Sequence, residues 1–147
     1  MPVSDLSTST ISIDAPVDAV RAILFDLAGY PSWSTAIKSA EVKATDDQGR
    51  ATSVKVSIDA GMMKDRVLLN YDWSAAPDRL EFSMEDADLL TAMNGAYITK
   101  AIDADTTSVT YELGVEVSLP IPAMMRTKAE KATIDQALTQ LKAHAEN

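Results

Sequence analysis

The sequence contains no cysteine, which excludes disulfides, thiolate nucleophiles, iron–sulfur clusters and cysteine-based zinc sites. Its one histidine, His144, lies three residues from the C-terminus, a poor place for a rigid catalytic or metal site. No glycine-rich phosphate loop or Schiff-base lysine stands out, so we expect neither a cofactor nor a metal. No apolar run approaches the roughly 20 residues of a membrane-spanning helix. Because the first residues also lack the pattern of a secretory signal, we expect a cytoplasmic protein.

Basic residues are in the minority. Thirteen Lys and Arg stand against 22 Asp and Glu, which gives a net charge of −9. Nucleic acids and anionic bilayers would be repelled over most of such a surface, so we expect neither nucleic-acid binding nor stable membrane insertion. The 147 residues are 46% hydrophobic and 24% charged, which is typical of one globular domain spanning residues 1–147.

The first third of the chain predicts a strand, a helix and a turn. Residues 6–13 place Leu and Ile among Ser and Thr, as in a strand with one polar face. Apolar residues at helical spacing then predict a helix over 16–28, with Pro16 in its first turn and Gly29 as its stop. Residues 30–33 form a short broken segment, for which we expect a single helical turn.

The middle of the chain has a period of two, which is typical of antiparallel strands with one wet and one apolar face. Strands are predicted at 53–60, 66–73, 79–85 and 109–117, and weaker ones at 37–45 and 93–102. The run Glu85 to Leu90 and the segment Gly61-Met62-Met63 are predicted to be connections between strands, with their Leu and Met residues either packed inward or exposed at a pocket rim. Arg66 is expected to face water. No Asp or Glu falls on an inward-facing position of any predicted strand.

Residues 119–122, LPIP, end the last strand because proline cannot donate to a strand ladder. A helix of about 36 Å is predicted over 122–145 at 1.5 Å per residue. The expected fold is therefore α+β: about seven antiparallel strands in a curved sheet around a long C-terminal helix, with a short helical segment after the first strand.

Such a sheet has more concave apolar surface than one helix covers. The excess is either filled by side chains or forms a cavity for a hydrophobic molecule. The final helix begins with Met124 and Met125 and continues with the small residues Thr127, Ala129 and Ala132. Flexible and small side chains on the covering helix favour a cavity, although methionine at this spacing is also common core filler.

The segment from Ile11 to Trp33, ISIDAPVDAVRAILFDLAGYPSW, resembles the opening of the polyketide cyclase/dehydrase-like branch of the START superfamily. The resemblance includes an Ala-Pro helix start, Asp26, the pair Tyr30-Pro31, and Trp33. It continues in Gly95-x-Tyr97, in Val109-x-Tyr111 and in the LPIP segment, so it covers essentially the whole chain. The resemblance implies a helix-grip fold that holds a hydrophobic small molecule between the sheet and the C-terminal helix.

The residues expected to line this cavity are the inward-facing strand residues, one aromatic residue near its mouth and the two methionines: Trp33, Val56, Ile58, Val67, Leu69, Tyr71, Trp73, Phe82, Tyr97, Tyr111, Leu113, Met124 and Met125. Trp33 and Tyr30 either touch a ligand or pack the corner between helix and sheet. Gly95 is expected to permit a bulge or a close approach of backbone.

Three functions remain open, because members of this superfamily share a cavity and not a chemistry. The first is binding or transport of a lipid, isoprenoid or polyketide-like molecule. The second is a cyclase or dehydratase in which Tyr71, Tyr97 or Tyr111 donates a proton, against the alternative that these tyrosines are structural. The third is a protein-interaction module with a filled interior. Cavity volume separates the third from the other two, and the oligomeric state is left open.

Overall fold

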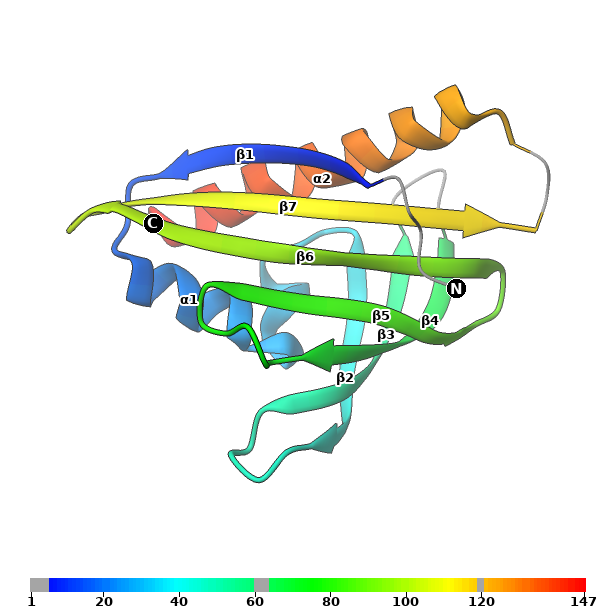
Figure 1. The fold of residues 1–147 in the computed structure, drawn as a ribbon, viewed down its shortest axis with the longest axis horizontal. Helices are drawn as coiled ribbons and strands as arrows, with labels where there is room; N and C mark the ends of the chain where they lie inside the picture. Colours follow the sequence, from blue (N-terminus) through cyan, green and yellow to red (C-terminus); the bar gives the residue numbers. More distant parts are fainter. Residues whose placement is uncertain (1–5, 60–63, 119–120) are drawn as a thin grey trace.

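Seven antiparallel strands form one curved sheet, and a long helix lies along part of it (Figure 1). This computed structural model describes residues 6–59, 64–118 and 121–147. The expected α+β architecture is confirmed. The elements follow the order β1 (Ser7–Ile13), α1 (Val17–Phe25), the 3-10 helix η1 (Leu27–Ser32), β2 (Ile37–Thr45), β3 (Ala51–Asp59), β4 (Lys64–Asp72), β5 (Arg79–Ala87), β6 (Leu90–Asp103), β7 (Thr106–Val117) and α2 (Ala123–Ala145).

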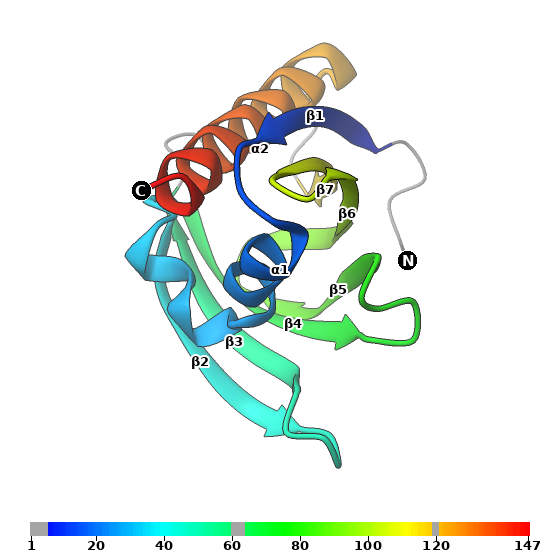
Figure 2. The ribbon, with the colours of Figure 1, turned by 90° about the vertical axis from the view of Figure 1, so that its left-hand side faces the viewer.

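The sheet has the strand order β1-β7-β6-β5-β4-β3-β2. Strands β2 to β7 therefore form a continuous meander, and β1 returns to pair with β7. Register shifts between β2 and β3, β4 and β5, and β6 and β7 mark irregularities that increase the local twist. The result is a curled sheet whose concave side faces α1, η1 and α2 (Figure 2).

Helix α2 packs mainly against β1 and β7. Its buried residues begin only at Glu130 and continue at helical spacing through Ile134, Ala137, Leu138 and Leu141. The carboxylate of Glu130 accepts hydrogen bonds from the Ser7 hydroxyl and from the Val115 N–H, both at 2.8 Å. The first turns of the helix thus lie beyond the packed region.

The helical segment after β1 is divided: the helix predicted over 16–28 is present but ends earlier, and the helical turn expected at 30–33 is part of a separate 3-10 helix. Helix α1 ends at Phe25, and the chain continues as η1 with Pro31 inside it. Gly29 lies so close to the Asp26 carboxylate that a Cβ at position 29 would be 2.4 Å from it. The hydroxyl of Tyr30 donates to the Leu24 carbonyl at 2.8 Å and ties η1 back onto α1.

The strand predictions agree with the structure in number and order, but several boundaries differ. The connection predicted within the run from Glu85 to Leu90 is present but shorter, because β5 extends to Ala87 and β6 begins at Leu90. Leu90 pairs with Val117 and is buried, whereas Leu89 is exposed. The predicted turn at 61–63 and the strand end at 119–120 lie outside the described residues.

Asp65 overturns the expectation that no carboxylate lies on an inward position. It has the same strand parity as Val67 and Leu69 and is buried. Its oxygens accept hydrogen bonds from the N–H groups of Asp88, Leu89 and Leu90 at 2.8–3.0 Å. Burial raises the pKa of Asp65, but backbone hydrogen bonds outweigh it and lower the pKa overall. The carboxylate thus holds the β5–β6 turn.

Gly95 allows two strands and an aromatic ring to approach closely. It pairs with Phe82 on β5 and with Leu113 on β7. A Cβ at this position would lie 2.1 Å from the Glu112 carbonyl oxygen and 2.9 Å from the ring of Phe82. Only glycine leaves room at this position for both the Glu112 carbonyl and the Phe82 ring, which is the close approach expected from the sequence.

We expect Gly95→Ala to lower the free energy of unfolding by about 2 kcal/mol or more, because the added methyl group collides with backbone and not with a flexible side chain. Denaturant unfolding of both proteins measures the difference. Gly49→Asn is the control, since Gly49 has a φ of 80° that Asn tolerates and open space around its Cβ. An alanine variant as stable as the parent would contradict this account of Gly95.

Candidate functional site

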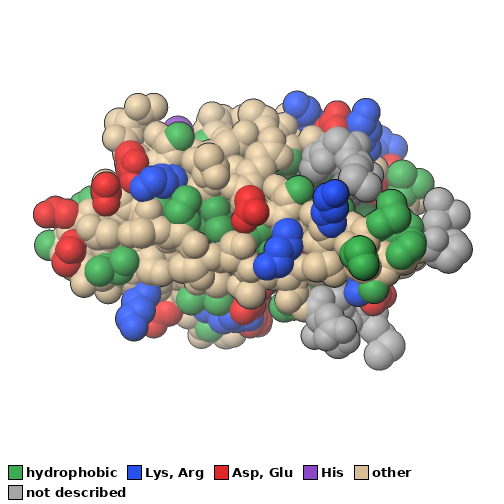
Figure 3. All heavy atoms as spheres, turned by 90° about the horizontal axis from the view of Figure 1, so that it is seen from above, with side chains coloured by type: hydrophobic (Ala, Val, Ile, Leu, Met, Phe, Trp, Pro, Cys, Tyr) green, Lys and Arg blue, Asp and Glu red, His purple; other side chains and the backbone are tan. Residues whose placement is uncertain are grey.

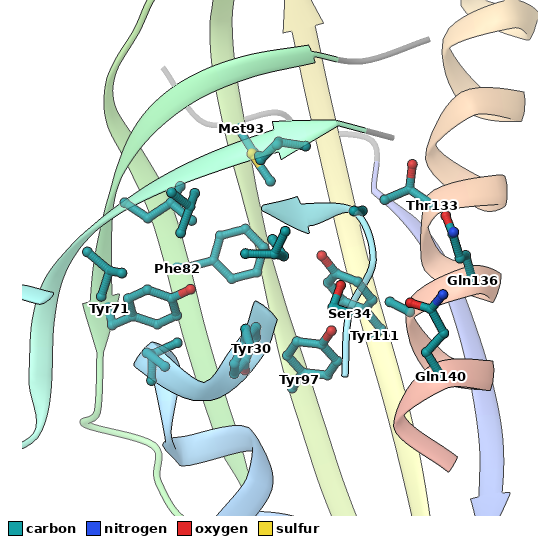
Figure 4. A pocket seen from close by; sticks show the side chains of 18 residues that line it. Tyr30, Ser34, Tyr71, Phe82, Met93, Tyr97, Tyr111, Thr133, Gln136 and Gln140 are labelled. Atoms are coloured by element: carbon teal, nitrogen blue, oxygen red, sulfur yellow. The ribbon is translucent and has the colours of Figure 1, made fainter. Parts of the chain in front are cut away.

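A cavity lies between the concave side of the sheet, η1 and α2 (Figure 4). Strands β3 to β7 supply its floor, the segment from Ser34 to Ile37 supplies one rim, and α2 supplies the other. The lining is mostly apolar, with Met93 and Phe82 among the residues at its base. The cavity is therefore built from the strand positions whose period-two pattern turns them inward, closed by one face of a helix.

The sequence has four tyrosines, and all four line this cavity: Tyr30, Tyr71, Tyr97 and Tyr111. The rings of Tyr97 and Tyr111 are stacked, with centroids 4.2 Å apart and an interplanar angle of 17°. Their side chains come from paired positions on β6 and β7, which explains the stacking. Tyr71 lies against Phe82 across β4 and β5, at 5.9 Å between centroids.

Three of these hydroxyl groups point into the space between the strands and α2, those of Tyr71, Tyr97 and Tyr111 (Figure 4). The Tyr30 hydroxyl is instead bonded to the Leu24 carbonyl. Burial raises the pKa of all four tyrosines above the ordinary value, and neighbouring tyrosines raise those of Tyr30, Tyr71 and Tyr97 further. At neutral pH these phenols are therefore protonated and act as hydrogen-bond donors.

The rim of the cavity is polar. Ser34, Thr133, Gln136 and Gln140 line it, and the exposed Thr35 joins its two sides. The Thr35 N–H donates to Gln140 Oε1 at 2.9 Å, while the side-chain amides of Gln140 and Gln136 donate to Thr35 Oγ1 at 2.8 and 3.0 Å. We call these three hydrogen bonds the Thr35 clasp. It connects the start of β2 to α2 across the mouth.

The cavity volume is about 50 Å³. That is room for a few water molecules and is well below the roughly 300–1,000 Å³ of a typical small-molecule pocket. In this conformation side chains fill most of the space between sheet and helix. A drug-sized ligand would therefore need the rim to move outward.

Seven of the thirteen residues predicted from the sequence line the cavity: Val56, Ile58, Leu69, Tyr71, Phe82, Tyr97 and Tyr111. The structure places the other six elsewhere. Val67 and Leu113 are buried in the core, and Trp33 packs on Tyr30 at 4.9 Å between ring centroids. Trp73 packs edge-on against Phe25 and donates to the Ala51 carbonyl at 2.7 Å. These four residues occupy packing positions.

Met124 and Met125 were predicted to face the cavity, and this is wrong. Their exposed fractions are 83% and 49%. They belong to the first turn of α2, which precedes the packed part of the helix. The small residues of α2 that were also expected to favour the cavity do not line it. Thr127 and Ala132 are exposed, and Ala129 lines a different groove.

The sequence reasoning missed the helix side of the cavity, which consists of Thr133, Gln136, Ala137 and Gln140. These residues have i, i+3, i+4, i+7 spacing and share one face of α2. In the sequence, this face of small and amide side chains lies beside the apolar stripe of the predicted helix, and that pattern could have indicated the helix side of the cavity. Val54, with the same parity as Val56, and Met93 on β6 also line the cavity.

None of the described residues that line the cavity is Asp, Glu, Lys, Arg or His. Across the described part of the chain, no group of three His, Asp or Glu residues is placed to hold a metal ion. Within the same residues, no helix is long and apolar enough to cross a bilayer. The chemistry that the cavity offers is thus hydrogen bonding from neutral hydroxyls and amides on an apolar wall.

Solved structures with the same fold cover almost the whole chain. A START superfamily protein from Mycobacterium smegmatis has a TM-score of 0.91 and 20% identity, over 96% of this chain and 97% of that one. The Zhui aromatase/cyclase from Streptomyces sp. R1128 has a TM-score of 0.75 and 16% identity, over 97% and 93%. These likenesses establish the helix-grip fold. Among curated proteins no relative was found by sequence.

A family profile matches residues 6–146, nearly the entire chain from β1 to the end of α2. The family is described as polyketide cyclase / dehydrase and lipid transport. Its match agrees with the resemblance noted in the segment from Ile11 to Trp33 and with the fold of the solved structures. This chain therefore belongs to the polyketide cyclase/dehydrase and lipid transport family.

Proposed function

We propose that this protein binds a small hydrophobic molecule with a carbonyl or hydroxyl oxygen in the cavity between the sheet and α2. One observation carries the proposal: protonated phenols from Tyr71, Tyr97 and Tyr111 point into a space whose walls are otherwise apolar beneath the polar rim. A ligand oxygen accepts hydrogen bonds from these phenols, and the aliphatic and aromatic walls bury the rest of the ligand. This is the usual composition of a small-molecule site.

The polar rim favours ligand binding over a merely filled core. A core filled by side chains rarely contains hydroxyl and amide groups, because burying such a group costs free energy unless it has a hydrogen-bond partner. Here Gln136 and Gln140 stand at the mouth, and the contact across it is the Thr35 clasp, made by side chains that solvent reaches. Such hydrogen bonds contribute only about 1 kcal/mol each, so the two sides can separate at small cost.

The small volume favours the third function named above, a protein-interaction module, over a permanently open pocket. Ligand binding remains the stronger proposal because opening is offset by burial of the ligand. About 300 Å² of apolar ligand surface contributes roughly 7 kcal/mol before association costs, at about 25 cal/mol per Å². The family description, which includes lipid transport, supports the same proposal.

Cyclisation is the second candidate, and the stacked Tyr97 and Tyr111 favour it. In an aldol-type cyclisation a tyrosine hydroxyl would donate to the carbonyl oxygen that is attacked. The reaction also needs a base that removes the proton next to a second carbonyl. The described lining has no carboxylate, imidazole or amine for this step, so binding is the better-supported function.

Binding is tested by native mass spectrometry of protein purified without detergent, with organic extraction of any adduct, and by titration with 2-naphthol. We expect a one-to-one complex and at least a tenfold loss of naphthol affinity in Ala137→Phe, because the added ring fills the cavity from α2. Ala132→Phe, on the exposed side of the same helix, should bind normally. Absence of any adduct and of naphthol uptake in the folded parent protein would favour the interaction module.

Catalysis is tested with a linear poly-β-ketone, whose aldol cyclisation and dehydration release one water molecule. We expect no cyclised product above the uncatalysed background, since the described lining holds no base. The variants Tyr71→Phe, Tyr97→Phe and Tyr111→Phe should differ from the parent only in affinity. Product formation by the parent that one of these variants abolishes while ligand binding persists would establish the cyclase instead.

The protonation state of the tyrosines predicts how stability depends on pH. In the unfolded chain tyrosine has a pKa near 10, and the folded values are higher, so above about pH 10 the unfolded chain releases protons that the folded one retains. The free energy of unfolding should be unaffected by these groups below that pH and should fall as pH rises further. Absorbance at 295 nm should show no tyrosinate until the native circular dichroism is lost, whereas in guanidinium all four should titrate near pH 10.

A further inference from the structure

A second hollow lies on the surface at the end of the molecule where β7 ends and α2 begins. It has a volume of about 140 Å³, and we call it the end groove. Its walls are the β5–β6 turn, the last residues of β7 and the first turns of α2, and most of its lining is apolar: Leu89, Leu90, Val115, Val117, Ile121, Met125 and Ala129. Two cationic side chains, Lys64 and Arg126, complete it. No residue of the tyrosine-lined cavity belongs to it.

The exposed apolar side chains of the described residues concentrate here. Leu89, Ile121 and Met125 in the lining are 66%, 45% and 49% exposed, and Met124 beside them is 83% exposed. Seen from above, hydrophobic side chains gather at this end of the molecule, next to basic ones (Figure 3). A patch of this kind on an otherwise acidic protein indicates a binding surface.

Hydrogen bonds fix the backbone of the β5–β6 turn in a conformation that leaves Leu89 exposed. The buried Asp65 accepts these hydrogen bonds from the N–H groups of residues 88 to 90. On the opposite wall, Met125 projects from a helix whose packing begins only at Glu130. The turn that forms one wall is thus anchored, and the exposed apolar side chains of that turn and of the first turns of α2 line the groove.

Arg126 provides the charge that selects a ligand. Its Nε is buried without a hydrogen-bond partner, and its guanidinium reaches Glu116 only at 4.0 Å, the limit of an ion pair. Lys64 lies 3.9 Å from Asp59, and Asp88 is paired with Arg66 at 3.0 Å. The acidic groups around the groove therefore leave Arg126 poorly neutralised. A carboxylate offers a planar pair of acceptors that fits a guanidinium better than the distant Glu116 does.

We propose that the end groove binds the aliphatic chain of a fatty-acid-like carboxylate, with the head group paired to Arg126 and the chain against Leu89 and Met125. This ligand site is separate from the tyrosine-lined cavity and does not depend on the function proposed for that cavity. The apolar walls select a chain, and the arginine selects an anion. A neutral or cationic amphiphile of the same length would lose the second contribution.

The test uses protein labelled with 13C in its methionine methyl groups, titrated with decanoate below its micelle concentration. Met125 reports on the end groove and Met93 on the tyrosine-lined cavity. We expect saturable shifts of Met125 with Met93 unchanged, and about tenfold weaker binding in Arg126→Gln. Lys128→Gln, which removes a positive charge from an exposed position of the same helix outside the groove lining, is the matched control and should bind within about twofold of the parent. Leu89→Asn, also expected to bind weakly, replaces Arg126→Gln if that variant does not fold.

Several outcomes would overturn the proposal. A shift of Met93 alone would place decanoate in the tyrosine-lined cavity, which supports the proposed function and contradicts the end groove. Binding of decyltrimethylammonium as tight as that of decanoate would show that the charge of Arg126 does not select the ligand. An affinity for decanoate that is unchanged in Arg126→Gln would show the same. Met125 shifts that follow protein concentration without ligand would assign the groove to a second copy of the chain. Binding to anionic vesicles without binding to monomeric decanoate would assign it to a membrane surface.

Discussion

The position of α2 on the sheet depends on one buried carboxylate. Glu130 accepts hydrogen bonds from the Ser7 hydroxyl on β1 and from the Val115 N–H on β7. Val115 lies two residues beyond Leu113, which is the residue of β7 that pairs with Ser7. Among the described residues β1 begins at Ser7, and the Val115 N–H donates to a side chain of the helix. Because a buried carboxylate without partners is very costly, sliding or rotation of α2 by one residue is strongly disfavoured. This contact places one helix face over the cavity and leaves the first turn of the helix free.

The tyrosine-lined cavity and the end groove both follow from that placement. The inward face of α2 after Glu130 packs against the sheet or lines the cavity, and Met125, Arg126 and Ala129 before it form a wall of the end groove. The curvature of the sheet then determines which strand positions face the cavity. Gly95 contributes by leaving room for the Phe82 ring, which contacts Tyr111 at 6.4 Å between centroids on the same concave surface.

Periodicity in the sequence was sufficient for the architecture and for the strand side of the cavity, because alternation along a strand translates directly into two faces. Val56, Ile58 and Tyr71 were predicted on this basis and do line the cavity. The helix side was not predictable in the same way. Met124 and Met125 lie on a regular helix, but their surroundings depend on where β7 ends in space, and no local pattern records that. Asp65 was missed because its partners are N–H groups 23 to 25 residues away.

The Thr35 clasp has a consequence for the timing of exchange. Its two glutamines lie one helical turn apart, so a single threonine holds the β2 end of the mouth against a length of α2. A ligand bound as proposed could not leave until this contact and the packing beneath it open. Its residence time would then be governed by the frequency with which the protein opens and not by diffusion of the ligand. Two ligands of very different affinity would leave at rates closer to each other than their equilibrium constants suggest.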